Sequence, residues 1–560
     1  MIERVEAIPS CDQIFIVWKL NAMIDNCVGF AVFRQEQGKQ PAPINTWVGF
    51  EGQKPATPGE HRPSTEWPVQ KTSWTDYLAP LIGKVRYGVT PVILTGANVT
   101  PNPATPDVWS DYVTLDQGDA SITAWFNRGT ISAQWLTRAL GSDEAPAKHL
   151  AEIIDKPGDK IRNFLAGRAR ERLIGHLDEA IANQRDTYAA LFELNDPELK
   201  AKLKALGGKA HLVLGNSDGG DDNNTRNTDL SATELATAGV DIVRRKIAPA
   251  RFAHNKFVVF TDGDGKPARV WTGSINWTET GVCTQNSNGL DLFDPNAAAA
   301  FKAHWQAIHD APSAALTENS AHDFTVQGSP VSAWFTPVGD TIDLAAARTL
   351  INGAKSGILF LMLNPGPAGL LGPIIERLSP LDNHYNADLY IRGVLNNFPN
   401  RGGPGTPDDQ VSLLTSEGKR QNFTGADLSS VLKPAAVGST ADWWQKELAS
   451  TGKFAIAVHS KVIVIDPAGD NPVVMTGSHN FSNRASTKND DNLVIVQGNS
   501  ALAHAYAVNI IGIYNEFRWR AWRNTPEGQQ DKGIKRNDKW LSDRIGADWL
   551  KRETKFWIGS

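Results

Sequence analysis

Residues 459–466 read HSKVIVID, and this stretch decides the fold expected for the chain. The run of Val and Ile predicts a buried strand, because β-branched residues suit a sheet that is covered on both faces. Side chains alternate along a strand, so His459 and Lys461 lie on the same face. An imidazole next to a cation at the start of an apolar strand favours a site for an anion.

The same pattern occurs a second time in the chain. Residues 254–278 read HNKFVVFTDGDGKPARVWTGSINWT, and residues 459–482 read HSKVIVIDPAGDNPVVMTGSHNFS. In each copy His-x-Lys opens an apolar run, and a turn leads to a second run that ends in Thr-Gly-Ser-x-Asn. From His to Gly there are 19 positions in the first copy (254 to 273) and 18 in the second (459 to 477), so we expect the extra residue in the connecting hairpin. The repeat predicts an internal duplication.

The segments before each copy alternate between helical and strand-like patterns. The helical segments are residues 164–184, 196–206, 344–354 and 370–378. The strand-like segments are residues 187–194, 208–216, 356–364 and 387–397. Alternation of this kind predicts an α/β fold in layers, with two related β/α lobes.

The N-terminal part of the chain has a different pattern. Short β-branched and aromatic runs alternate there with loops rich in Pro and Gly, which predicts a small all-β sandwich. Residues 74–92, WTDYLAPLIGKVRYGVTPV, resemble a segment of fibronectin type III modules. We therefore expect a sandwich over residues 1–110, a first lobe over 111–325, and a second lobe with a Trp-rich C-terminal extension over 326–560.

The second copy, HxKxxxxD followed by GSxN, resembles the signature of the phospholipase D superfamily. The first copy looks like the same motif with its acid one position late, at Asp262, because Thr261 stands at the matching position. The resemblance covers about residues 120–510. It implies two lobes that face each other across a pseudo-twofold axis, each of which contributes one His, one Lys and one Asn.

The resemblance implies a reaction on a phosphodiester. One imidazole can attack phosphorus and form a phosphohistidine, while the other protonates the leaving alkoxide. By analogy His254 is the nucleophile and His459 the general acid, although the near-symmetric motifs leave the reverse assignment open. Lys and Asn side chains can hold the non-bridging oxygens, so neither a metal ion nor a cofactor is expected. The remaining catalytic candidates are Lys256, Asn276, Lys461 and Asn480.

Further polar residues accompany the two motifs. Ser274 and Ser478 are expected to donate to an imidazole or to the phosphate, as substrate-binding residues. We group Asp466 with the catalytic set, with an orienting role rather than a reacting one.

The segment after each motif suggests that the two halves differ. Asn489 and Asp491 resemble the NxE tail of the family. The first half has Asn286 and Asn288 in this region and lacks the acid. This difference predicts different roles for the two lobes.

Composition limits the substrate and the location. The net charge of −5 argues against a surface that binds nucleic acid everywhere, but leaves a local basic groove open. The N-terminus has no Sec-type signal, and the most apolar segment, residues 357–375, is interrupted by Asn, Pro and Gly. A cytoplasmic protein is expected, with export by a specialised system left open.

Three functions follow from these observations. The first is hydrolysis or transphosphatidylation of phospholipids at a membrane surface. The alternative is a nuclease of the same superfamily that cleaves DNA or RNA. A catalytically dead binding module is the least favoured, because both His-Lys pairs and both Asn residues are intact. Since both motifs lie in one chain, we expect a monomer.

Overall fold

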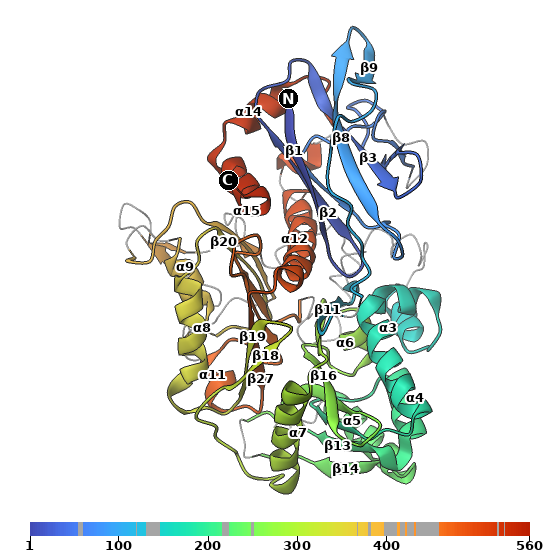
Figure 1. Cartoon of the computed structure of the whole chain (residues 1–560), viewed down its shortest axis with the longest axis vertical. Coiled ribbons are helices and arrows are strands. Elements are labelled where there is room, and N and C mark those ends of the chain that lie inside the picture. Colours follow the sequence, from blue (N-terminus) through green and yellow to red (C-terminus); the bar gives the residue numbers. More distant parts are fainter. Residues whose placement is uncertain are drawn as a thin grey trace.

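The computed structural model describes most of the chain, and Figure 1 shows how its parts are arranged. The described residues are all except 54–59, 119, 130–145, 216–222, 248–250, 367, 379–381, 397–411, 415–419, 423–430, 433–457, 524–525, 531–532 and 560. An N-terminal β region, blue in Figure 1, is followed by two β/α lobes, and the last helices of the chain return to the N-terminal region. Within the described residues, none of the helices has the length and apolar character needed to cross a bilayer.

The first lobe is built on a seven-stranded sheet with the order β11-β17-β16-β15-β12-β13-β14. Strands β12, β13 and β14 are parallel, whereas β15 is antiparallel to β12. The strands are β11 (Ile122–Phe126), β12 (Thr187–Leu191), β13 (Ala210–Leu214), β14 (Asp241–Arg244), β15 (Lys256–Thr261), β16 (Pro267–Gly273) and β17 (Asn288–Leu292).

The second lobe is built on an eight-stranded sheet with the order β18-β19-β27-β26-β25-β20-β21-β24. Apart from the added β18, strands β19, β27, β26, β25, β20, β21 and β24 follow the same path as the seven strands of the first lobe. The internal duplication predicted from the sequence is therefore present. The strands are β18 (His322–Val326), β19 (Ser329–Phe335), β20 (Gly357–Met362), β21 (Tyr390–Leu395), β24 (Val431–Leu432), β25 (Val462–Ile465), β26 (Val473–Gly477) and β27 (Asn492–Gln497), and β22 (Ser412–Leu414) pairs with β23 (Arg420–Asn422) apart from this sheet.

The hairpin that follows each His-x-Lys strand accounts for the difference in spacing. In the first lobe Phe260 pairs with Arg269, and in the second Ile465 pairs with Val473. The chain between these pairs is residues 261–268 in the first lobe and 466–472 in the second. The extra residue of the first copy therefore lies in the hairpin, as predicted.

Helices cover both faces of each sheet. In the first lobe Phe257 of β15 packs on Phe301 of α7, whereas Phe260, on the other face, packs on His176 of α3. In the second lobe α8 packs against one face of the sheet and the long α12 against the other. The helices of the lobes are α2 (Pro146–Ile154), α3 (Lys160–Ala182), α4 (Pro197–Leu206), α5 (Asn223–Thr237), α6 (Glu279–Cys283), α7 (Pro295–Asp310), α8 (Ile342–Asn352), α9 (Leu371–Glu376), α11 (Asn483–Thr487) and α12 (Ser500–Arg523), with 3-10 turns η2 (Gly207–Lys209) and η3 (Gly339–Thr341).

The N-terminal region is all-β, as expected. One sheet has the order β1-β2-β7 and the other β10-β8-β3-β4, with β9 beside β8. Val113 and Leu115 still belong to this region, because Val113 bridges to Val85 and Leu115 lies in its core. The strands are β1 (Ile2–Pro9), β2 (Ile14–Leu20), β3 (Cys27–Glu36), β4 (Ala42–Pro43), β7 (Ser73–Asp76), β8 (Val85–Thr95), β9 (Asn98–Pro101) and β10 (Val108–Trp109), with β5 (Asn45–Thr46) paired to β6 (Arg62–Pro63).

The C-terminal helices α13 (Pro526–Gln530), α14 (Lys539–Ile545) and α15 (Asp548–Ile558) join the N-terminal region to the second lobe. Trp540 donates from its indole nitrogen to the carbonyl of Cys27, and Trp557 packs on Phe15 with ring centroids 4.7 Å apart. On the other side Phe556 packs on Tyr390 of β21. The tail therefore belongs to the interface between the N-terminal β region and the second lobe.

A buried ion pair joins the two lobes. Arg245 follows β14 of the first lobe, and its Nη2 donates to Oδ1 of Asp490 in the second lobe at 3.2 Å. Both side chains are almost completely buried. Arg245 also donates to the carbonyls of Ala311 and Ala314, so its donors are satisfied from both sides of the junction. The pair fixes the segment that carries Asp490 against the first lobe.

Asp490→Ala should destabilise the junction strongly, because it leaves the guanidinium of Arg245 buried without its counter-charge. Loss of one partner of a buried pair costs about 3–5 kcal/mol. Urea unfolding followed by tryptophan fluorescence should show a clearly lower midpoint than the wild type. Asp264→Ala, in the exposed hairpin after β15, should leave the midpoint unchanged, and equal midpoints for Asp490→Ala and the wild type would contradict this role.

Candidate active site

The two His-x-Lys strands begin at the junction of the lobes. The backbone N–H of His254 donates to the carbonyl of Asp490 at 2.8 Å, and the N–H of His459 donates to the carbonyl of Asn286 at 2.9 Å. Parallel bridges pair Ala253 with Asp490 and Asn286 with Val458. Each histidine strand is thus anchored on the segment after the Gly-Ser-x-Asn motif of the other lobe. This arrangement brings the two copies face to face.

Buried polar side chains repeat this symmetry across the junction. Thr272 Oγ1 donates to Asn492 Oδ1 at 2.7 Å, and Asn288 Nδ2 donates to Thr476 Oγ1 at 2.9 Å. Thr272 and Thr476 precede the Gly of the two motifs, and Asn288 and Asn492 begin β17 and β27. These contacts set the distance and the orientation of one motif relative to the other.

The two glycines of the Gly-Ser-x-Asn motifs allow this close approach. Gly273 and Gly477 have φ angles of +142° and +139°. A Cβ atom would lie 2.2 Å from the carbonyl oxygen of Asn288 at the first position and 2.3 Å from that of Asn492 at the second. Only glycine fits at these two positions.

The two lysines are buried together at the centre of the junction. Lys256 Nζ donates to the carbonyl of His254, and Lys461 Nζ donates to the carbonyl of His459, both at 2.8 Å. Burial lowers the pKa of Lys256 to about 7, against the raising effect of Asp491 and Glu193. Burial and the charge of Lys256 lower the pKa of Lys461 well below its ordinary value. A bound anion would relieve the repulsion between these ammonium groups.

His254 has a carboxylate partner from the opposite lobe. Its Nδ1 lies 2.7 Å from Oδ1 of Asp491. A carboxylate only accepts, so Nδ1 carries the proton and Nε2 is free to react. Burial lowers the pKa of His254 to about 4, with a further lowering by Lys256, while Asp491 opposes both. Burial raises the pKa of Asp491, but His254 outweighs it and holds that pKa below its usual range.

His459 has a different environment. Burial lowers the pKa of His459 well below its ordinary value, and Lys461 and Lys256 add to this effect. Its Nδ1 is buried and has no hydrogen-bond partner among the described residues. Because Val458 bridges to Asn286 as Ala253 does to Asp490, the counterpart of Asp491 is Ser287.

This assignment corrects the alignment made from the sequence. There Asn286 and Asn288 were set against Asn489 and Asp491, which is one residue out of register. The absence of an acid at this point of the first lobe is nevertheless correct. Ser287 is buried, and its hydroxyl lacks a partner within the described part of the chain.

The two serines are already engaged within the protein. Ser274 Oγ donates to Asn288 Oδ1 at 3.1 Å, and Ser478 Oγ donates to Asp491 Oδ1 at 2.7 Å. Both are fully buried. We expected them to donate to an imidazole or to the phosphate, whereas the structure shows them orienting the segments that carry Asn288 and Asp491.

Asp466 lies at the far end of β25, away from the other predicted residues. Its carboxylate accepts hydrogen bonds from the backbone N–H groups of Lys355, Ser356 and Gly357 at 2.7–2.9 Å. Five residues of extended chain separate it from Lys461, or about 16 Å. It therefore holds the start of β20 and takes no part in the site. In the first lobe Thr261 bonds to the carbonyl of Asp186 in the same region, while Asp262 only closes the exposed hairpin.

The two asparagines of the motifs have different supports. Asn276 Nδ2 donates to Glu193 Oε2 at 2.8 Å. Asn480 follows His479, which is completely buried, with Nδ1 accepting from the N–H of Phe481 and Nε2 lying 3.2 Å from Asp343. The Oδ1 atoms of Asn276 and Asn480 are both buried without a partner among the described residues.

A cleft of about 690 Å³ opens beside His254. Phe192 packs edge-on to His254 with ring centroids 4.9 Å apart, and Phe252 packs edge-on to Phe192. The guanidinium of Arg484 lies 4.7 Å from the ring centre of Phe252. The remaining lining residues are Asn364, Gly366, Ala368, Asn480, Ser482, Asn483 and Asn489.

The structure thus brings together His254, Lys256, His459 and Lys461, with Asn276 and Asn480 beside them. Residues 410–511, which include the second copy of the motif, match the family model described as cardiolipin synthase, PLD-like domain. The segment that carries the second copy of the motif is therefore similar to a PLD-like domain. No curated protein matches the sequence.

Several solved structures resemble this chain. Polyphosphate kinase from Porphyromonas gingivalis is 12% identical with a TM-score of 0.37, and the match covers 72% of this chain and 58% of that one. Phosphatidylserine synthase from Haemophilus influenzae is 12% identical with a TM-score of 0.39, covering 69% and 93%. The phospholipase D family member Nuc from Salmonella typhimurium is 16% identical with a TM-score of 0.21, covering 25% and 88%. The chain spans less than two thirds of the polyphosphate kinase.

Proposed function

We propose that the protein is a metal-independent phosphodiesterase that works through a phosphohistidine. The observation that carries this proposal is the burial of two His-Lys pairs together at the lobe junction, with a single carboxylate, that of Asp491, bonded to one of the imidazoles. The two lysines supply the positive charge that an anionic phosphodiester needs. One chain supplies both halves of the site, so a monomer is sufficient.

The reaction has two steps. In the first, Nε2 of His254 attacks phosphorus, the bond to the leaving oxygen breaks, and His459 gives its proton to that oxygen. In the second, water or an alcohol gives a proton to His459 and attacks phosphorus, and the bond to His254 breaks. The product is a phosphomonoester with water and a new diester with an alcohol.

The difference between the lobes supports this assignment of roles. Asp491 fixes the tautomer of His254 and stabilises the positive charge that the ring acquires when it attacks. At the corresponding position His459 meets Ser287, which has no charge. A protonated His459 is therefore held by the backbone of Ser274 and by the bound phosphate, without a carboxylate beside it, and it releases its proton readily when the leaving group needs it.

Phospholipid is the substrate that we favour. The family model that matches the second lobe is described as a cardiolipin synthase domain, which supports a lipid phosphodiester. The cleft beside His254 combines the aromatic rings of Phe192 and Phe252 with the cation of Arg484, so it can hold an apolar group and an anion at once. Nucleic acid is the alternative substrate.

The assay uses mixed phospholipid micelles with EDTA and a small amount of ethanol. We expect phosphatidic acid and phosphatidylethanol, detected by mass spectrometry, since ethanol competes with water for the phosphoenzyme. His254→Ala and His459→Ala should each lower the rate by at least about 1,000-fold, because general acid–base and nucleophilic groups contribute factors of this size. His384→Ala, in an exposed loop, is the matched control.

Full activity in either active-site variant would contradict the two-histidine mechanism. Lipid that stays intact would move the proposal to the nuclease. In that case single-stranded and duplex DNA are the next substrates, and binding should weaken steeply as salt rises.

The acidic limb of kcat/KM should report on His254, which attacks as the neutral imidazole. Activity should be lost as the pH falls through about 4, the lowered pKa of this residue. Asp491 raises that pKa, so Asp491→Asn should move the limb to lower pH and reduce kcat/KM by about 100-fold through loss of orientation. The profile is measured with bis(p-nitrophenyl) phosphate. Asp466→Asn should keep the wild-type limb, and an unmoved limb in Asp491→Asn would count against the role of Asp491.

A further inference from the structure

The loop between β12 and α4 lies directly against the motif that carries Asn276. The backbone N–H groups of Asn195 and Asp196 both donate to the carbonyl of Trp277 at 3.0 Å, and Leu194 forms a parallel bridge with Trp277. The two loops therefore hold a fixed relative position. Glu193, which no sequence motif identified, lies in this loop.

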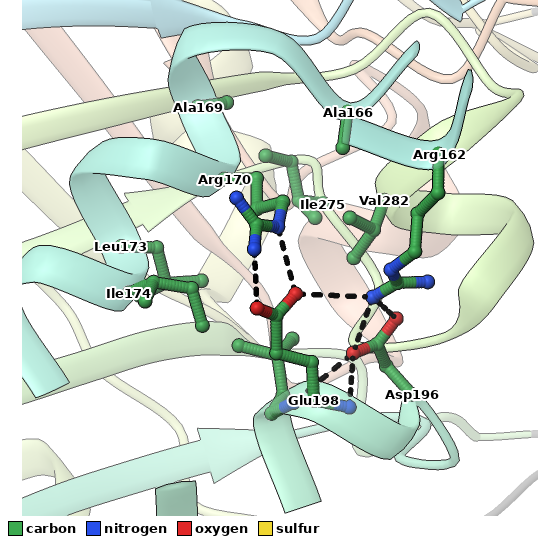
Figure 2. A pocket seen from close by; sticks show the side chains of 11 residues that line it. Arg162, Ala166, Ala169, Arg170, Leu173, Ile174, Asp196, Glu198, Ile275 and Val282 are labelled. Atoms are coloured by element: carbon green, nitrogen blue, oxygen red, sulfur yellow. Dashed lines mark hydrogen bonds and ion pairs between the residues drawn. The ribbon is translucent and has the colours of Figure 1, made fainter. Parts of the chain in front are cut away.

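Figure 2 shows the base on which this loop rests. Arg162, on α3, donates from Nη2 to both carboxylate oxygens of Asp196, at 3.0 and 2.7 Å, and both residues are almost completely buried. Asp196 also caps the start of α4 through the N–H groups of Glu198 and Leu199. The carboxylate of Glu198 pairs in turn with Arg170. This network makes the loop rigid, and its carboxylates are taken up by α3 rather than by the site.

Glu193 instead bonds to a motif residue. Its Oε2 accepts from Nδ2 of Asn276 at 2.8 Å. Because a carboxylate has no proton to donate, the amide nitrogen of Asn276 must face Glu193. One N–H is then used by Glu193 and the other remains for a ligand. Glu193 therefore fixes which atoms Asn276 presents.

The second lobe has no such charge at this position. Leu191 of β12 pairs with Lys256, whereas Leu361 of β20 pairs with Val462, one residue after the lysine of the second motif. Leu361 is therefore the counterpart of the residue before Leu191. Counting on along both chains from these positions makes Asn364 the counterpart of Glu193. Asn364 lines the cleft. The carboxylate of Glu193 thus belongs to the first lobe alone, as Asp491 belongs to the second.

The charge of Glu193 acts on Lys256. The negative groups that face Lys256 are Asp491 and Glu193, and both raise its pKa against the effect of burial. The other titratable groups around it are the opposing ammonium of Lys461 and the rings of His254 and His459.

We propose that Glu193 is a positioning residue of this site, which turns the amide of Asn276 so that one N–H faces the phosphate and which places a negative charge on the side of Lys256. The inference rests on the proposed phosphodiesterase function. It implies that a neutral residue at position 193 weakens the hold on the substrate anion as the pH rises, whereas a residue that also breaks the bond to Asn276 impairs the reaction at every pH.

The test compares Glu193→Gln, Glu193→Asp and Glu193→Ala over pH 5 to 9 with bis(p-nitrophenyl) phosphate. Glu193→Gln should move the alkaline limb of kcat/KM to lower pH, because Lys256 loses its proton earlier, and should raise KM about tenfold at pH 8. Glu193→Asp should restore the limb. Glu193→Ala should also lower kcat about tenfold at pH 6. Glu198→Gln, whose carboxylate pairs with Arg170, should lower the melting temperature and leave the limb in place.

Tungstate binding, measured by calorimetry on the same variants, separates this inference from the proposed function. Weaker binding to Glu193→Gln than to the wild type at pH 8, with equal binding at pH 6, supports the role of Glu193. Equal binding at both pH values, or an unmoved limb in an active Glu193→Gln, overturns it. A wild type that binds tungstate but cleaves no phosphodiester contradicts the proposed function instead, and the binding comparison still decides the role of Glu193.

Discussion

The bond between His254 and Asp491 is the interaction on which the site depends. It joins an imidazole of the first lobe to a carboxylate of the second at 2.7 Å, where both are buried. Two lysines and two histidines share this space, and unpaired buried charges are costly. Asp491 offsets part of that cost, orients one ring and receives the hydroxyl of Ser478. The carboxylate therefore contributes to the fold of the junction and to the chemistry at the same time.

Duplication explains how such a site can form. Each lobe alone has one His-Lys pair and one segment that can receive a histidine strand from its partner. When two copies face each other, contacts of one half are repeated in the other, as with Thr272 to Asn492 and Asn288 to Thr476. The copies then differ at a few positions. Ser287 is the counterpart of Asp491, and Asn364 is the counterpart of Glu193. The first motif therefore has one carboxylate on each side, and the second motif has none.

Most of the fold and the central residues could be predicted from the sequence. The apolar strands, the repeated order of helices and strands, and the spacing of His-x-Lys and Gly-Ser-x-Asn depend on local patterns that the structure preserves. Asp466 looked like part of the motif because it is close in sequence. An extended strand nevertheless carries a side chain about 3.3 Å further with each residue, so five residues place it at the other end of the sheet.

Other features depend on contacts between distant segments. The sequences around Asn286 and Asn489 allow two alignments, and only the register of β17 and β27 against their neighbours selects Ser287 as the partner position of Asp491. Glu193 and His479 have no motif of their own, since their roles come from the loops against which they pack.

The most direct test of the account is to trap the covalent intermediate. His459→Ala lacks the residue that activates water, so with bis(p-nitrophenyl) phosphate, whose leaving group needs no proton, the phosphoenzyme should form and persist. Rapid quenching at high pH followed by peptide mass spectrometry should find the p-nitrophenyl phosphoryl group on His254 in this variant. It should find no adduct on His459 in His254→Ala. A stable adduct on His459, or no adduct in either variant while the wild type turns over, would contradict the assignment of His254 as the nucleophile.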